Sequence, residues 1–139
     1  MLFDLLSAAI LLFAAGFHFY WGLGGRVGWQ AALPTQGDGQ RAFTPRAGAA
    51  HAVGLVLVVA VLIIGMHAGV LPPLLPAWAT RAAVALMALV FLVRAFGWFR
   101  YAGWFKAVRD TRFGRYDTWF YCPLCLVLGL SLGRLAWLG

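Results

Sequence analysis

The stretch AAHAVGLVLVVAVLIIGMHAGVL, residues 49–71, contains no aspartate, glutamate, lysine or arginine. A helix of about 20 apolar residues crosses the hydrocarbon core of a bilayer and satisfies its own backbone hydrogen bonds there. This stretch therefore predicts a transmembrane helix. Three more apolar stretches extend that interpretation to the whole chain, at about residues 2–23, 78–99 and 118–138.

The overall composition agrees with this interpretation. Of the 139 residues, 63% are hydrophobic and 11% are charged, whereas soluble domains have roughly half and one quarter. We expect one all-α integral membrane domain over residues 1–139, a four-transmembrane-helix bundle that is multi-pass in the cell (inner) membrane. The first stretch has no basic start and is as long as a span, so it is expected to remain as an anchor and not to be cleaved as a signal peptide.

The basic residues predict the orientation of the bundle. Most of them lie in the two long segments between spans, namely Arg26, Arg41, Arg46, Arg100, Lys106, Arg109, Arg112 and Arg115. Only Arg81 and Arg134 lie on the other side. Because positive loops remain in the cytoplasm, we expect an N-out/C-out arrangement with two long cytoplasmic loops. The net charge of +7 is thereby assigned to topology, and no nucleic-acid partner is expected.

Several short motifs occur in a fixed order along the chain. They are HFYWGLGG at residues 18–25, Pro34, Arg94, RYAG at residues 100–103, FGRYDT at residues 113–118 and YCPLC at residues 121–125. In this combination the sequence resembles a family of small four-helix bacterial membrane proteins known as domain of unknown function 3995. The resemblance covers essentially the whole chain and implies the four-helix architecture, but it implies no activity.

Arg94 is the most informative single residue, because an ionised side chain inside a span indicates a functional site or a partner. Asp117 opens the fourth span at a similar depth, and we expect the two to pair. With Arg100, Tyr121 and Trp21 they are the predicted ligand-binding residues of a pocket on the cytoplasmic side. The expected function is a binding or transport module for an anionic or polar-headed small molecule or lipid.

An intramembrane enzyme is the alternative interpretation. Cys122 and Cys125 have the spacing of thiol redox motifs, which would suit a thiol or quinone oxidoreductase, and Asp110 or Asp117 could serve a lipid-modifying enzyme. Against this, the cysteines fall on the reducing side and have no second pair for exchange. Carboxylates among arginines also suit ion pairing better than proton transfer. No motif requires a cofactor.

No metal site is expected as the leading interpretation. An alternative set of two histidines and two cysteines, His18, His51, Cys122 and Cys125, lies at one depth and has ligand types that zinc accepts. His67 lies near the opposite end of its span and joins no predicted cluster.

Two further patterns concern the partners of the chain. Lys106, Arg109, Arg112 and Arg115 recur every three residues, which favours a short helix on the membrane surface in contact with lipid headgroups.

Small residues recur four apart in three pairs, at Ala50 and Gly54, Gly65 and Gly69, and Gly129 and Gly133. Such pairs allow close helix packing within the chain, or a homodimer or assembly subunit as the alternative.

Overall fold

The computed structural model describes residues 2–42, 44–97 and 99–139. The described chain is all-α, and four of its helices are long and apolar enough to cross a membrane. They are α1 (Leu2–Gly22), α3 (Ala47–His67), α4 (Ala77–Phe96) and a continuous helix from Arg112 to Leu138. This confirms the prediction of an all-α chain with four candidate spans.

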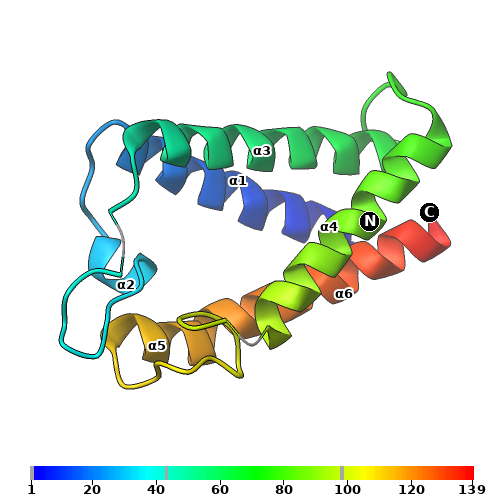
Figure 1. Cartoon of the computed structure of the whole chain (residues 1–139). Coiled ribbons are helices and arrows are strands. Elements are labelled where there is room, and N and C mark those ends of the chain that lie inside the picture. The colour runs from blue at the N-terminus through cyan, green and yellow to red at the C-terminus, as the bar shows by residue number, and fades with distance from the viewer. Residues whose placement is uncertain (1, 43, 98) are drawn as a thin grey trace.

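The helices pack as two pairs, which approach each other at the end that holds both termini and diverge toward the other end (Figure 1). α1 packs along α3, and α4 packs along α6 (Cys122–Leu138), with smaller contacts between α3 and α4 and between α1 and α6. Both termini and the α3–α4 connection lie at one end of the bundle, which we call the terminal end. The described parts of residues 23–46 and 97–111 lie at the other, the loop end.

The helix ends differ from the predicted spans by a few residues. α3 ends at His67 because Gly69 takes a positive φ of 73°, and the amides of Val70 and Leu71 then bond back to the Gly65 carbonyl. α4 ends at Phe96, before the predicted end of the third span; Trp98, within that predicted span, lies outside the described residues.

The core between the helices is apolar and tightly packed at two glycines. Leu11, Val84 and Leu132 are among its fully buried side chains. A Cβ on Gly129 would lie 2.7 Å from Leu92 Cγ, and one on Gly54 would lie 3.0 Å from the Phe19 ring. Two of the predicted small-residue pairs thus contribute to packing within the chain.

The prediction of a surface helix over residues 106–115 is wrong for its first half. Helix α5 (Arg112–Tyr116) starts only after an N-cap in which the Thr111 hydroxyl accepts from the Gly114 amide at 2.9 Å. Lys106 does not face headgroups, since it is 1% exposed. Its side chain turns inward because a buried carboxylate lies within reach of its ammonium group.

A short helix at the loop end was not predicted. Helix α2 (Trp29–Ala32) packs against α5 (Arg112–Tyr116), and the Arg112 guanidinium donates to Gln30 Oε1 at 2.9 Å. This contact holds the first long loop against the second.

Candidate functional site

A fully buried carboxylate organises the loop end. Asp117 is the first residue of a π-helical turn, η1 (Asp117–Tyr121), and its side chain is 0% exposed. Its Oδ1 accepts from Arg94 Nη2 at 2.6 Å, and its Oδ2 accepts from the Gly103 amide at 2.8 Å and lies 3.1 Å from Lys106 Nζ. The Cys122 thiol donates to the same Oδ2 at 3.5 Å. The expected pairing of Arg94 with Asp117 is confirmed, and Lys106 is a partner that the sequence did not indicate.

The connection between α4 and α5 is shaped to reach this carboxylate. Gly103 has a φ of 90°, and a Cβ on it would fall 2.2 Å from the Gly97 carbonyl oxygen, so only glycine fits there. Lys106 Nζ also donates to Thr118 Oγ1 at 2.6 Å, and Trp104 Nε1 donates to the Thr118 carbonyl at 3.1 Å. These bonds fasten the connection onto the start of the last span. π-Helical turns such as η1 occur frequently at functional sites.

The charges of this cluster do not balance. Arg94 and Lys106 supply two positive charges, and Asp117 supplies one negative charge. Nη1 of Arg94 is buried and has no hydrogen-bond partner among the described residues, although the side chain as a whole is 31% exposed. The Tyr121 ring stacks on the Phe113 ring, with the centroids 6.0 Å apart. We call Arg94, Lys106, Asp117 and Cys122 the loop-end cluster.

Two of the predicted ligand-binding residues make other contacts. Arg100 is exposed, and its guanidinium lies 5.5 Å from the centre of the Tyr101 ring. The Trp21 indole donates to the Val27 carbonyl at 2.9 Å and so closes the turn after α1. The structure thus pairs Arg94 with Asp117, and it gives Arg100 and Trp21 different neighbours.

The predicted thiol and metal residues are dispersed. Cys122 and Cys125 are both free, and Cys122 is fully buried as a hydrogen-bond donor to the cluster. His18 and His51 each bond through Nδ1 to the carbonyl four residues earlier in their own helix. Within residues 2–42, 44–97 and 99–139, no group of three or more histidine, cysteine, aspartate or glutamate side chains could hold a metal.

The acidic candidate Asp110 has an environment unlike that of Asp117. It is exposed and lines a cavity of about 500 Å³ between the two loops, together with Trp29, Arg41 and Arg112. The structure therefore separates the two acidic residues of this region into one surface group and one buried group.

A second ion pair lies at the terminal end and was not predicted from the sequence. Asp4 of α1 is 6% exposed, and its Oδ1 accepts from Arg134 Nη2 of α6 at 2.8 Å. One turn further along, the Ser7 hydroxyl donates to the Ser131 hydroxyl at 3.0 Å. A signal was available, because Asp4 and Arg134 are ionisable residues inside two spans on the same predicted side.

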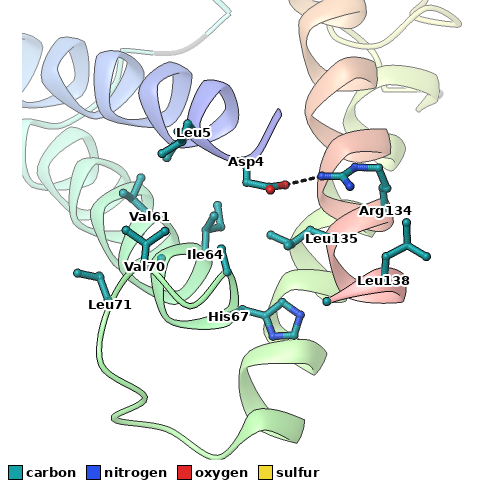
Figure 2. Close-up of a pocket in the computed structure, with 14 residues that line it drawn as sticks. Asp4, Leu5, Val61, Ile64, His67, Val70, Leu71, Arg134, Leu135 and Leu138 are labelled. Carbon is teal, nitrogen blue, oxygen red and sulfur yellow. Dashed lines mark hydrogen bonds and ion pairs between the residues drawn. The ribbon is translucent and has the colours of Figure 1, made fainter. Parts of the chain in front are cut away.

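A cavity of about 480 Å³ opens beside this ion pair. Figure 2 shows Asp4 and Arg134 on one side of it, His67 on the other, and aliphatic side chains from α1, α3 and α6 around them. The aliphatic part of the lining comprises Leu5, Ala8, Val61, Ile64, Ala68, Val70, Leu71, Leu135 and Leu138.

His67 lies in the wall between this cavity and a second one of about 440 Å³, since it lines both. Its Nδ1 lies 3.1 Å from the Thr80 hydroxyl, whereas its Nε2 is buried and has no hydrogen-bond partner among the described residues. This contact of His67 with Thr80 was not predicted from the sequence. No local signal could have shown this, because the chain turn between α3 and α4 brings Thr80 to the ring.

Comparison with known proteins identifies the family. Residues 11–132 match the family described as protein of unknown function, DUF3995, and the chain belongs to that family. The matched region includes the loop-end cluster and His67, whereas Asp4 and Arg134 lie outside it. No curated protein and no solved structure matches the chain.

Proposed function

We propose that this member of the family is a membrane-embedded binding module that holds an amphiphile by its anionic headgroup, at the loop end, against Arg94. The observation that carries the proposal is the unpartnered Nη1 of Arg94 in a buried cluster with one positive charge in excess. An uncompensated charge in a low-dielectric environment is strongly stabilised by a counter-ion. Guanidinium groups recognise phosphate and carboxylate with paired N–H donors.

Exposed cations around the cluster support an anionic headgroup as the ligand. Arg100, Arg109, Arg112 and Arg115 are all exposed at the loop end. Basic residues next to a span attract the anionic headgroups of a leaflet. These residues would raise the local concentration of the ligand, and Arg94 would bind it. Transport, the other form of the predicted function, would start from the same contact.

The same charges support a topology. We propose that the loop end faces the cytoplasm and the terminal end faces outward, in the cell (inner) membrane. A reporter enzyme that works only in the cytoplasm, fused after Gly139, is expected to be inactive, and one that works only outside is expected to be active. The opposite result would reverse the orientation.

Lipid retention by variants tests the binding proposal. The protein is placed in phosphatidylcholine nanodiscs that contain a minority of phosphatidylglycerol, and native mass spectrometry records which lipid stays bound. The wild type is expected to retain phosphatidylglycerol, and Arg94→Leu is expected to retain it about tenfold less, since hydrogen bonds to charged groups contribute about 1.5–3 kcal/mol. Inorganic phosphate added as a competitor distinguishes a site for free anions from one that requires the lipid.

The structure provides matched controls for this experiment. Arg94→Leu leaves Asp117 paired with Lys106, so the cluster becomes neutral and the protein is expected to fold. Arg94→Lys keeps the charge but loses the second N–H branch, and it should bind phosphatidylglycerol with intermediate strength. Arg115→Leu removes an exposed cation at the same end and should change retention little. Unchanged retention by folded Arg94→Leu would contradict the proposal.

A further inference from the structure

At the terminal end, the buried polar atom without a hydrogen-bond partner among the described residues is Nε2 of His67. The following contacts show that it is an acceptor, whereas Nη1 of Arg94 at the loop end is a donor. The Thr80 hydroxyl has one proton, which it donates to the Ala77 carbonyl at 3.0 Å. With that proton donated to the Ala77 carbonyl, the hydroxyl accepts from His67, and we assign the ring proton to Nδ1 on this basis. Nε2 of the neutral ring is then an acceptor, and it is buried without a donor in the described parts of the chain.

The surroundings of Nε2 favour an uncharged ligand. The Asp4 carboxylate and the Arg134 guanidinium pair at 2.8 Å, so both signs of charge line this cavity. An anion would meet the Asp4 carboxylate, and a cation would meet the Arg134 guanidinium. The rest of the lining is mainly aliphatic, which suits a hydrocarbon chain. A group that donates one hydrogen bond and carries an apolar chain satisfies each of these conditions.

The cavity can be reached from the lipid. Four of its aliphatic lining residues are also exposed on the surface of the protein: Leu5 at 51%, Val70 at 59%, Leu71 at 37% and Leu138 at 70%. These aliphatic side chains would face hydrocarbon in a membrane. An amphiphile could therefore enter sideways from the bilayer without crossing water.

We propose that the terminal-end cavity binds a long-chain alcohol of the membrane, whose hydroxyl donates to Nε2 of His67. The alkyl chain lies along the aliphatic lining toward Leu71 and Leu138. This site is separate from the one at Arg94, both in position and in the chemistry that it selects.

A pair of matched probes tests the site in the unaltered protein. Hexadecan-1-ol can donate a hydrogen bond, and hexadecyl methyl ether has the same chain but can only accept. In phosphatidylcholine nanodiscs, native mass spectrometry is expected to show the alcohol retained about fivefold to tenfold more than the ether, the effect of one neutral hydrogen bond. Equal retention of the two probes, or a preference for the ether, would overturn the proposal.

Variants then assign the preference to His67. His67→Leu is expected to remove it, and His67→Gln, whose amide oxygen is an acceptor, is expected to restore part of it. Arg94→Leu should leave the preference unchanged, so a failure of the headgroup site cannot be mistaken for a failure of this one. A preference that persists in folded His67→Leu would contradict the proposal. Palmitate retained more than the alcohol, and lost in His67→Leu, would also overturn it, because the cavity would then select an anion.

Discussion

The two ends of the bundle each bury an aspartate against an arginine from another helix, yet they leave opposite polar atoms unmatched. At the loop end, Asp117 faces Arg94 and Lys106, and a guanidinium N–H donor is left over. At the terminal end, Asp4 pairs with Arg134, and the buried atom left over is an acceptor on His67. The buried polar atom left over at each end therefore determines which ligand that end could bind, and the number of arginines does not.

The ends also differ in how strongly the fold depends on them. The Asp117 and Lys106 side chains are both 0% exposed, whereas Arg134 is 40% exposed. Removal of one partner from a fully buried set leaves a charge with no compensation. An ion pair that is partly exposed contributes less, because solvent screens it.

The largest effect is expected at Asp117. Asp117→Asn leaves two cations without their counter-charge and should lower the free energy of unfolding by about 3–5 kcal/mol. Thermal or denaturant unfolding in detergent measures this. The double variant Asp117→Asn/Arg94→Leu leaves one cation fewer and should lose less than the single variant. Equal losses would show that the pair does not stabilise the fold.

The next largest loss of stability is expected at Gly103, whose backbone amide donates to Asp117. Gly103→Ala puts a Cβ on a residue with a φ of 90° and against the Gly97 carbonyl, so a loss of about 2 kcal/mol is expected in the same unfolding assay. Gly16→Ala is the control, because a Cβ on that helical glycine meets nothing within 4 Å. A tolerated Gly103→Ala would mean that the loop can reach Asp117 in another conformation.

A smaller effect is expected for the ion pair at the terminal end. Asp4→Asn removes a charge whose partner Arg134 is 40% exposed, so the free energy of unfolding should fall by only about 1 kcal/mol. Asp38→Asn, at an exposed loop position, should leave the same measurement unchanged. A loss at Asp4 as large as that at Asp117 would remove the contrast between the ends.

The smallest effect is expected at Cys122. Cys122→Ser keeps a donor to Asp117 and should stay within about 0.5 kcal/mol of the wild type in unfolding, whereas Cys122→Ala should lose about 1 kcal/mol. Cys125→Ser serves as the control for the second thiol. If serine and alanine are equivalent, the thiol contributes nothing to the cluster.

The sequence predicted the parts of this arrangement that depend on hydropathy and depth. The four spans follow from apolar length, and the pairing of Arg94 with Asp117 follows from their similar depth. The role of Lys106 was not predictable, because its regular spacing with other cations indicated a surface helix, and only the turn at Gly103 brings it inside. His67 was missed for a similar reason, since the partner that fixes its ring lies in the next helix.

Binding of both probe types to two variants tests the central claim most directly. Phosphatidylglycerol and hexadecan-1-ol are offered together in phosphatidylcholine nanodiscs to the wild type, Arg94→Leu and His67→Leu. We expect Arg94→Leu to lose phosphatidylglycerol and keep the alcohol, and His67→Leu to lose the alcohol and keep phosphatidylglycerol. If either folded variant loses both ligands together, or if neither variant changes either one, the two ends are not separate sites of opposite hydrogen-bonding character.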